Sequence, residues 1–365
     1  LNRVLAEDVI SAINVPGYDN SAMDGYAVHS TECAEAGVLF KVSQRIPAGR
    51  SGVKLETGTA ARIFTGAPLP EGADAVVMQE LCQQQADSVI INASVMTGEN
   101  IRRAGEDIEK GSVILKAGTR IRPQEQGLIA SVGQVAINVR RKLKVATFFT
   151  GDELVEPGRE LAQGQIYNSN RYTMRAQLNK WGFELVDLGV ARDEPQVVRE
   201  LLEKAAAEAD VILTSGGVSV GEEDHVKAVV ESLGSLDLWR IAIKPGKPFA
   251  FGSVNGTPFL GLPGNPVSVF VTMLVIARPF LFASQGVAAT GLHAVRQKAL
   301  FSRKSSFRED YIRVRSTEQG LEPYSNQSSG ALFSTSWGDG LVRQPAEETI
   351  EQGNTVDYLP FALFN

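Results

Sequence analysis

The sequence predicts a multidomain protein of the α/β and β classes. A central α/β domain with a mostly parallel sheet is expected beside an inserted small β domain and a C-terminal β domain. Its 365 residues are too many for one ordinary hydrophobic core. Strand and helix patterns alternate from Leu143 to Leu281, as in a sheet with helices on both faces. Short alternating runs between glycine and proline turns fill residues 37–100 and 288–365, which is typical of small β domains.

The composition narrows the classes of function. The balance of 43% hydrophobic and 21% charged residues is ordinary for a soluble globular protein. The net charge of -6 argues against nucleic acid as the main partner, because such proteins usually carry a basic domain. The two cysteines lack a CxxC spacing and fit a reducing compartment, so a cytoplasmic location is expected. The most apolar stretch, Val267 to Leu281, contains polar residues and predicts a buried helix rather than a membrane span.

The first segment combines a short strand with a polar cluster. The chain opens at Leu1 without methionine, in what resembles the middle of a folded pattern, so we expect that an N-terminal piece is missing. A strand or turn is predicted over Arg3 to Ile10. Residues 19–25 then crowd Asp, Asn, Ser and Gly together. These residues favour turns, so an Asx-rich turn before a strand is the simplest interpretation.

The inserted β domain is predicted from four short runs and contains no clear helix pattern. Its expected strands are Leu39–Val42, Ala61–Phe64, Ala75–Met78 and Val89–Ile91.

A second polar cluster follows at Asn100–Ile108, and a solvated turn with weak surface ion pairs would explain it. Pro123–Val132 predicts a short helix with proline in its first turn, and Val135–Val139 predicts a strand.

The central domain is predicted to alternate buried strands with helices. Its strands are expected at Leu143–Phe149, Glu184–Val190, Val211–Leu213, Leu238–Ile243 and as a pair around Gly252–Thr257. Its helices are expected at Ser169–Trp181, from Pro195 to near Asp210, at Asp224–Leu233 and from Pro266 onward. In such sheets, ligands bind beyond the carboxyl ends of the strands. Four polar loops follow those ends, which predicts a site there: Thr150–Glu153, Ser215–Asp224, Lys244–Lys247 and Leu262–Pro266.

The C-terminal β domain is predicted from runs at Tyr311–Arg315, Ala331–Phe333 and Thr355–Leu359. The resulting division has four parts: an N-terminal linking domain (1–9 plus 112–143), the inserted domain (10–111), the α/β domain (144–287) and the C-terminal domain (288–365).

The loop Ser215–Asp224 has the character of an anion-binding turn. Three glycines stand between a buried strand and a helix, an order that presents backbone N–H groups to an anion. The loop matches neither the Walker pattern nor the dinucleotide fingerprint. Lys244 and Lys247 are either solvated or face an anion, because burying both without a partner is costly. Asn265 and Pro266 stand at the start of a predicted helix. They serve as an ordinary N-cap, or the backbone N–H groups there bind an anion, and both roles can hold together.

Four carboxylates are expected around the same pocket: Asp152, Glu153, Asp193 and Asp224. Acids among phosphate-binding groups usually hold Mg²⁺ together with substrate phosphates. Helix capping is the alternative for Asp193 and Asp224. No serine, cysteine or histidine has the partners of a nucleophilic triad. The residues therefore predict metal-assisted phosphoryl or anion chemistry that works by positioning and electrostatics.

Several motifs together resemble the molybdopterin molybdenumtransferase family, the bacterial relatives of the gephyrin E domain. Residues 214–224, Thr-Ser-Gly-Gly-Val-Ser-Val-Gly-Glu-Glu-Asp, resemble the loop of molybdopterin-binding domains. The other motifs stand in family order along nearly the whole chain: Asp19–Ala27, Phe64–Pro68, Arg103–Asp107, Thr150–Leu154, Lys244–Pro248 and Gly261–Pro266. The resemblance implies insertion of molybdenum from molybdate into adenylyl-molybdopterin, with release of AMP and with Mg²⁺ assisting. It also implies a homodimer whose site is shared between subunits.

The resemblance also implies roles for individual residues. The catalytic set is Asp24, Asp107, Glu153, Asp193 and Asp224, with Glu153 and Asp224 as metal ligands. The molybdate set is Ser219, Lys244, Lys247, Arg313 and Ser329, of which Arg313 and Ser329 rest on a looser match. The molybdopterin or nucleotide set is Thr65, Thr150, Gly151, Asp152, Ser215, Gly216, Gly217, Pro263, Gly264, Asn265 and Pro266. Asp24, Thr65 and Asp107 would act from the partner subunit.

Two other functions stay open at this point. A molybdopterin adenylyltransferase would share the domain type of residues 144–287, but it is normally a lone domain, and the flanking β domains argue against it. A non-catalytic, gephyrin-like scaffold would bind a receptor peptide, but residues 288–365 show no peptide groove pattern. The expected partners are small-molecule substrates and the preceding adenylyltransferase, without nucleic acid or membrane.

Overall fold

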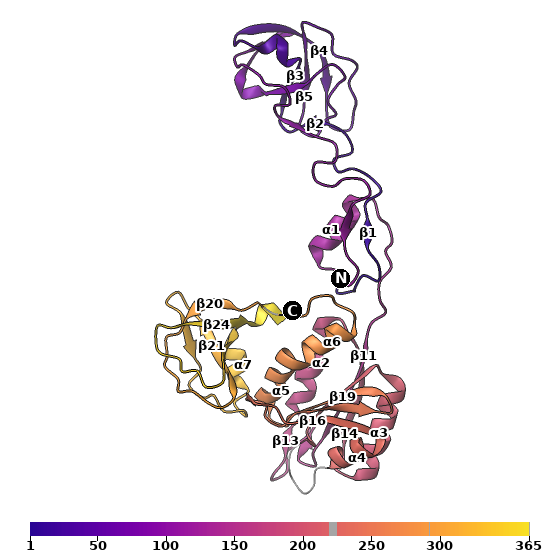
Figure 1. The fold of residues 1–365 in the computed structure, drawn as a ribbon, viewed down its shortest axis with the longest axis vertical. Coiled ribbons are helices and arrows are strands. Elements are labelled where there is room, and N and C mark those ends of the chain that lie inside the picture. The colour runs from indigo at the N-terminus through magenta and orange to yellow at the C-terminus, as the bar shows by residue number, and fades with distance from the viewer. Residues whose placement is uncertain (219–224, 292, 365) are drawn as a thin grey trace. The chain divides into compact units, whose positions relative to one another are not determined.

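The computed structural model describes residues 1–218, 225–291 and 293–364 (Figure 1). The chain divides into two compact units, which are described separately. Unit 1 consists of Leu1, Leu5–Ala117 and Ile121–Asn138. Unit 2 consists of Asn2–Val4, Gly118–Arg120 and the chain from Val139 onward.

Unit 1 contains a six-stranded sheet in the order β6-β3-β5-β4-β8-β7. Its strands are β3 (Gly25–Val28), β4 (Val38–Ile46), β5 (Thr59–Ile63), β6 (Ala75–Met78), β7 (Cys82–Gln85) and β8 (Ser88–Ile91). The four strands predicted between residues 37 and 100 are confirmed. Apolar side chains such as Tyr26, Phe40 and Val89 form the core of this sheet. Two 3₁₀ helices, η1 (Ser30–Cys33) and η2 (Gln79–Leu81), and a pair of β2 (Asn20–Ser21) with β9 (Ile101–Arg102) complete this part.

The rest of unit 1 pairs β1 (Val9–Ile10) with β10 (Val113–Leu115) and carries α1 (Pro123–Ser131). The predicted helix is confirmed, with Pro123 in its first turn. The strand predicted at Val135–Val139 is wrong, because the structure has no strand element there. The Val135 side chain is 101% exposed. An alternating pattern makes a strand only where a neighbouring strand and a covered face are present.

The α/β domain of unit 2 is a six-stranded sheet in the order β14-β11-β15-β19-β18-β16. Its strands are β11 (Lys144–Thr150), β14 (Glu184–Ala191), β15 (Val211–Ser215), β16 (Gly234–Trp239), β18 (Ala250–Val254) and β19 (Thr257–Leu262). The neighbours from β14 to β19 pair in parallel, whereas β18 is antiparallel to both β19 and β16. The expected α/β class is confirmed, with a mixed sheet. A two-residue Asn255-Gly256 turn joins β18 to β19, and such tight turns connect only antiparallel strands.

Helices cover both faces of this sheet (Figure 1). One face packs against α2 (Ser169–Trp181) and α5 (Pro266–Thr272), and the other packs against α3 (Pro195–Glu208) and α4 (His225–Leu233). Alternating β11 residues divide between the faces: Val145 and Phe149 pack with α2, and Ala146 and Phe148 pack with α3. The helices predicted for this domain are confirmed over the described residues; Asp224, the predicted first residue of the third helix, lies outside them.

The apolar stretch forms one long helical segment, Pro266–Ser284. It comprises α5, a π-helical turn η3 (Met273–Ala277) and α6 (Arg278–Ser284). Among the described residues, it is the one helix whose length and mean hydropathy of 1.9 would suit a membrane span, yet 61% of its window is buried inside the protein. Val267, Val271 and Leu281 belong to the core of the α/β domain. The predicted buried helix is therefore confirmed.

The single strand predicted at Leu238–Ile243 is wrong, because two strands of different sheets occupy this region. β16 ends at Trp239, and β17 (Ile243–Lys244) pairs in parallel with β21 of the C-terminal sheet. Arg240 lies between them with φ of 95°. A positive φ interrupts the extended backbone, so the chain leaves the first sheet at this residue.

The C-terminal sheet has the order β17-β21-β23-β24-β20, and β22 pairs with β21. Its further strands are β20 (Val295–Lys298), β21 (Glu309–Ser316), β22 (Leu321–Pro323), β23 (Gly340–Gln344) and β24 (Thr355–Pro360). The strand predicted at Ala331–Phe333 is wrong, because the run leads into α7 (Phe333–Trp337). The Ser334 hydroxyl donates to the Ala331 carbonyl at 2.7 Å, which favours a helical turn.

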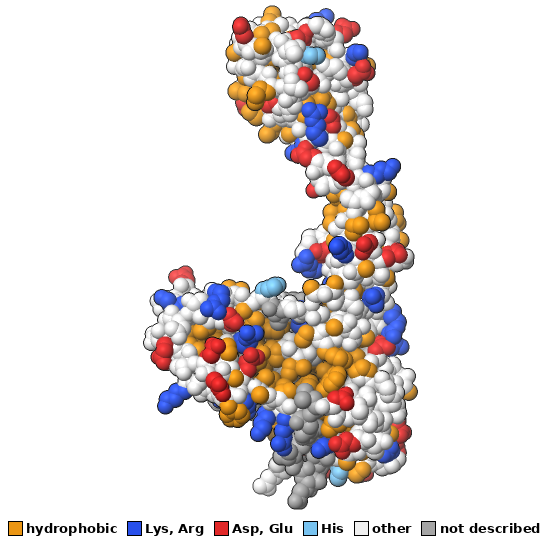
Figure 2. All heavy atoms as spheres, viewed as in Figure 1, with side chains coloured by type: hydrophobic (Ala, Val, Ile, Leu, Met, Phe, Trp, Pro, Cys, Tyr) orange, Lys and Arg blue, Asp and Glu red, His pale blue; other side chains and the backbone are white. Residues whose placement is uncertain are grey.

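The C-terminal sheet and the α/β domain share one hydrophobic core. Leu341, Leu359 and Phe364 of the last strands and of η4 (Phe361–Phe364) belong to the cluster that contains the α5 side chains. Figure 2 shows hydrophobic side chains gathered between the two domains of unit 2, with charges of both signs interspersed over the C-terminal domain. This shared core holds the start of α5 close to the C-terminal domain.

Candidate active site

Five strands of the α/β domain run in the same direction: β14, β11, β15, β19 and β16. Their carboxyl ends therefore lie along one edge of the sheet, where ligands bind in open α/β folds. A cavity of about 510 Å³ opens at this edge. Its volume falls within the range that is usual for small-molecule sites.

The cavity brings together most of the residues predicted for substrate binding. The loops after β11, β15 and β19 line it. Pro248 also lines it and directly follows the loop Lys244–Lys247, called the lysine loop below. The predicted residues that line it are Thr150, Gly151, Glu153, Asp193, Ser215, Gly216, Gly217, Pro263, Gly264, Asn265 and Pro266. Asp152 is absent from the lining; its Oδ1 lies 3.5 Å from the Asp193 backbone nitrogen, which donates to it.

Glycine allows the loops to approach one another closely. Gly216 has φ of 93°, and a Cβ there would lie 2.5 Å from the Thr150 carbonyl oxygen. Its backbone nitrogen donates to the Leu262 carbonyl at 3.3 Å. The loop after β15 is therefore held between the ends of β11 and β19, in a conformation that requires glycine.

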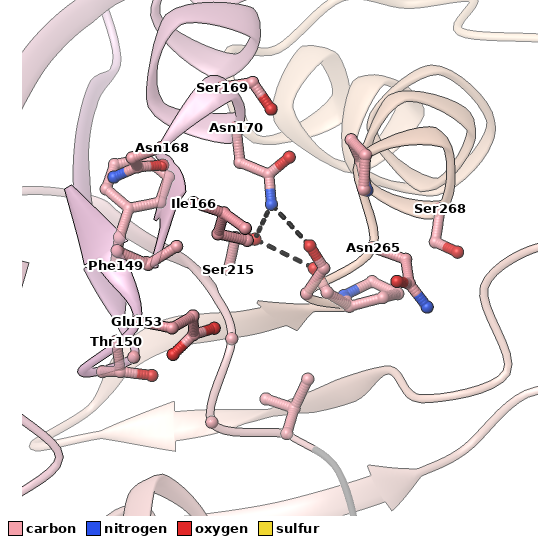
Figure 3. Close-up of a pocket in the computed structure, with 18 of the residues that line it drawn as sticks. Phe149, Thr150, Glu153, Ile166, Asn168, Ser169, Asn170, Ser215, Asn265 and Ser268 are labelled. Atoms are coloured by element: carbon pink, nitrogen blue, oxygen red, sulfur yellow. Dashed lines mark hydrogen bonds between the residues drawn. The ribbon is translucent and has the colours of Figure 1, made fainter. Parts of the chain in front are cut away.

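A hydrogen-bond network connects the start of α2 to two of these loops (Figure 3). Asn170 Nδ2 donates to Ser215 Oγ at 3.0 Å and to the Gly264 carbonyl at 2.7 Å. Ser215 Oγ donates in turn to the Pro263 carbonyl at 2.9 Å. Asn265 makes no side-chain capping hydrogen bond, although it precedes α5.

The segment that carries Asn170 lies outside the loops predicted for the site. The lining residues not predicted for the site are Phe149, Leu154, Ile166, Tyr167, Asn168, Ser169, Asn170, Val218, Pro248 and Ser268. The available signal is the run Asn168-Ser169-Asn170 at the start of the predicted helix Ser169–Trp181. Asn168 does cap α2, because its Oδ1 accepts from the Arg171 backbone nitrogen at 3.2 Å. What the sequence did not show is that this helix begins at the carboxyl edge of the sheet.

Thr150 Oγ1 and Asn168 Nδ2 are buried polar atoms of the lining that have no hydrogen-bond partner among the described residues. Buried polar groups are nearly always paired in folded proteins. A polar ligand in the cavity would supply partners for such groups.

A small parallel pair, β12 (Leu154–Val155) with β13 (Ile166–Tyr167), borders the cavity. The Tyr167 hydroxyl donates to the Arg159 carbonyl at 2.9 Å, and the residue is 45% exposed. Arg171, in the first turn of α2, forms ion pairs with Glu156 at 2.9 Å and with Asp187 at 3.0 Å.

The lysine loop differs from the other loops, because neither lysine lines the cavity. Lys247 is exposed. Lys244 Nζ lies 3.7 Å from Asp310 Oδ2, and that same oxygen accepts from Arg303 Nη2 at 2.5 Å. Since the Asp310 side chain is 3% exposed, Lys244 faces a buried carboxylate that already has a cation partner.

The two predicted residues of the C-terminal domain also stand outside the lining. Arg313 is 1% exposed and donates to Ser334 Oγ at 3.1 Å and to the Ser328 carbonyl at 3.0 Å. Burial lowers the pKa of Arg313 to about 10. The Ser329 carbonyl accepts from the Val267 backbone nitrogen at 3.0 Å. These contacts support the start of α5, next to the lining residue Pro266.

The predicted residues of unit 1 are Asp24, Thr65 and Asp107, and none of them is among the residues that line the cavity. Asp24 Oδ1 accepts from the Thr65 backbone nitrogen at 2.8 Å and from its hydroxyl at 2.7 Å, which holds the pKa of Asp24 below its ordinary value. Asp107 is exposed, and its backbone nitrogen donates to the Val15 carbonyl at 3.0 Å. Arg103 pairs with Asp19 at 2.6 Å, as expected for a solvated turn.

Ser219 and Asp224 lie outside the described residues, as does Gly221. Among the residues that the structure describes, no group of three or more His, Cys, Asp or Glu side chains could hold a metal ion by itself.

Comparison with known proteins identifies relatives along the whole chain. Three family models match in order: "MoeA N-terminal region (domain I and II)" over residues 1–133, "Probable molybdopterin binding domain" over 146–283, and "MoeA C-terminal region (domain IV)" over 298–361. A molybdopterin molybdenumtransferase of Haemophilus influenzae is 45% identical over 286 residues, which cover 78% of this chain and 71% of the relative. One of a Nostoc species is 39% identical over 295 residues, which cover 78% and 68%.

The solved structures agree with this assignment. A crystal structure of a molybdopterin biosynthesis moeA protein from Pyrococcus horikoshii matches with a TM-score of 0.86 at 28% identity, covering 99% of this chain and 92% of that chain. The sequence resemblance is thereby confirmed, and the matches to both flanking regions argue against a lone adenylyltransferase domain. The chain belongs to the molybdopterin molybdenumtransferase family, a family of enzymes.

Proposed function

We propose that the chain inserts molybdenum from molybdate into adenylyl-molybdopterin and releases AMP, as a step of molybdenum cofactor biosynthesis. The observation that carries this proposal is the 510 Å³ cavity at the carboxyl edge of the sheet, lined by the loops after β11, β15 and β19. The names of the relatives supply the substrate class.

Different loops of the cavity would bind different parts of the substrate. The glycine-rich loop with Gly216 and Gly217 would approach the phosphate groups, because glycine lets the backbone come close to an anion. Thr150, Gly151, Asp152, Ser215 and the loop from Pro263 to Pro266 would bind the remainder of the molybdopterin or nucleotide.

Molybdate, as the second substrate, would be bound at the lysine loop. Lys247 is exposed and available for an oxyanion, and Lys244 is 43% exposed in its side chain despite the contact with Asp310. Ser219 would complete this subsite. Arg313 and Ser329 would support it from the C-terminal domain, since both contact elements next to the start of α5 rather than the cavity.

Mg²⁺ fits the donor set of the cavity. Glu153 and Asp193 both line it, and Mg²⁺ in phosphate sites typically takes one or two carboxylates together with substrate phosphates. Glu153 would hold the ion together with Asp224, which lies outside the described residues, and Asp193 is a further candidate because it also lines the cavity. Bound there, Mg²⁺ would neutralise charge on the phosphate groups.

The functional unit would be a cytoplasmic homodimer. The partner subunit's Asp24, Thr65 and Asp107 would form the opposite wall of the site, because all three are polar and exposed in unit 1 and the first two are hydrogen-bonded to each other. The preceding adenylyltransferase would supply the adenylylated substrate. Nucleic acid and membranes are not proposed as partners.

The test is release of AMP from adenylyl-molybdopterin by the purified protein. We expect release that requires molybdate, that falls when EDTA removes divalent cations and that returns with added Mg²⁺. Absence of molybdate-dependent release would overturn the proposal. An ATP-dependent activity without molybdate would instead favour the adenylyltransferase.

A further inference from the structure

We propose that Asn170 is a positioning residue that holds the loops after β15 and β19 in the arrangement that forms the cavity. The identity of the ligand in this inference rests on the function proposed above. The network itself rests on the contacts of Asn170, Ser215 and the carbonyl groups of Pro263 and Gly264.

Asn170 uses both hydrogens of its amide. One is donated to Ser215 Oγ at 3.0 Å and the other to the Gly264 carbonyl at 2.7 Å (Figure 3). Ser215 Oγ in turn donates a hydrogen bond to the Pro263 carbonyl at 2.9 Å. One side chain at the start of α2 therefore orients two loops that both line the cavity.

The loop after β19 depends on these side-chain donors. The parallel ladder between β15 and β19 ends at the pair of Ser215 and Leu262. Pro263 follows and has no backbone N–H, so it cannot extend the ladder as a donor. Beyond Leu262, the carbonyl groups of Pro263 and Gly264 receive their hydrogen bonds from Ser215 and Asn170.

Only a side chain with two donors satisfies this arrangement. An aspartate at position 170 has nearly the same volume, but its ionised carboxylate only accepts hydrogen bonds. It would face the Gly264 carbonyl, acceptor against acceptor. Asn170→Asp should therefore disturb the loops more than Asn170→Ala, which is the reverse of the order expected if Asn170 served only to fill space.

The first experiment follows hydrogen–deuterium exchange in the unliganded full chain. Asn170→Ala should raise exchange in peptides that cover residues 214–218 and 261–268, with the far end of α2 unchanged. Asn179→Ala and Asn179→Asp are the matched controls, because Asn179 is an exposed residue of the same helix. Unchanged exchange in both loops of the Asn170 variants would overturn the proposal, whether or not the protein is a transferase.

The second experiment measures binding of AMP by calorimetry at constant salt. Asn170→Ala should weaken binding about tenfold, and Asn170→Asp more than that, because lost hydrogen bonds and a facing acceptor both disorder the loops. The Asn170→Asp defect should shrink as pH falls toward about 4, where a protonated carboxyl regains one donor, while the Asn170→Ala defect stays constant.

A double variant connects the effect to the network. Asn170→Ala combined with Ser215→Ala should weaken AMP binding less than the two single effects multiplied together, because the residues act as a unit. Independent effects, or an Asn170→Asp variant that binds AMP better than Asn170→Ala, would overturn the inference. If the wild-type protein binds no AMP while the Asn170 variants still show raised exchange in the two loops, the result would contradict the proposed function alone.

Discussion

At the scale of single residues, the cavity depends on positions where one residue type satisfies the local geometry. Gly216 is the clearest case, since both its φ of 93° and its approach to the Thr150 carbonyl exclude a side chain. The sequence showed this loop as a glycine-rich turn but not what the glycine lies against. Contacts between segments about 65 residues apart arise from the tertiary fold, so no local pattern reports them.

Gly216→Ala should destabilise the protein by about 3 kcal/mol, because a positive φ and a backbone clash both oppose alanine. Gly158→Ala is the matched control: φ there is 96°, but nothing lies within 4 Å of the added Cβ, so about 1 kcal/mol is expected. Urea unfolding measures both changes. Equal losses in the two variants would show that the contact with Thr150 does not matter.

Asp210 provides a pH-dependent contact within unit 2. Its carboxylate accepts from both terminal nitrogens of Arg141 at 2.6 Å and from the Lys144 backbone nitrogen at 2.8 Å. The hydrogen bond from Arg141, with further support from Lys144, holds the pKa of Asp210 below its ordinary value of 3.8. Because the folded-state pKa is the lower one, this stabilisation is present above pH 3.8 and is lost as pH falls through the folded-state pKa.

Asp210→Asn should therefore lower the free energy of unfolding by about 1 kcal/mol near neutral pH. The difference from the wild type should stay constant from pH 7 to 5 and shrink below the ordinary aspartate pKa. Urea unfolding across this range gives the difference at each pH. Asp237→Asn, at an exposed position of the same unit, should show no such trend. A difference that grew on acidification would contradict the assignment.

At the scale of elements, buried strands and long helices followed from the sequence because burial and periodicity coincide in them. The predicted bounds of α2 match the observed ones: Gly182 ends the helix with φ of 88°, and in the structure Asn168 caps its start. The errors lie where tertiary contacts decide. Val135–Val139 alternates but is not a strand, and residues 238–243 divide between two sheets at Arg240. A local pattern contains no information on the presence of a neighbouring strand.

The candidate site was predictable to the same extent. The loops after β11, β15 and β19 were expected at one edge because parallel strands share the direction of their carboxyl ends. Residues 166–170 were not predicted for the site. They reach that edge through the pair of β12 and β13, and strands of two residues are too short to show a periodic pattern in the sequence. The same limit applies to Arg313, whose burial depends on the packing of the C-terminal domain.

α2 is also joined to the end of the chain by a buried hydrogen bond. Trp181 is 1% exposed, and its Nε1 donates to the Phe364 carbonyl at 2.5 Å. Trp181→Phe should cost about 2 to 3 kcal/mol, because it leaves a carbonyl unpaired and a void in the core. Trp337 is partly exposed and packs against the Tyr324 ring, so Trp337→Phe should lower the free energy of unfolding by less than about 1 kcal/mol. Thermal unfolding compares the two, and a smaller loss at Trp181 would contradict the assigned hydrogen bond.

At the scale of the whole molecule, the two units contribute different chemistry. Unit 2 holds the cavity and its carboxylates, whereas unit 1 presents the paired Asp24 and Thr65 on an exposed surface. In unit 2, one core extends from α2 through α5 into the C-terminal strands. Substitutions in that core would therefore affect the cavity edge and the C-terminal domain together, while unit 1 could be altered without disturbing the cavity itself.

The proposed sharing of the site between subunits gives the last prediction. Asp24→Asn alters unit 1 and Glu153→Gln alters unit 2, and each variant alone should lack molybdate-dependent AMP release. Co-expression produces mixed dimers in which one of the two sites combines an intact unit 2 with an intact unit 1 of the partner. With random pairing, about a quarter of wild-type activity should return. A site formed within one chain would recover none, because every site of a mixed dimer would then carry one of the two substitutions.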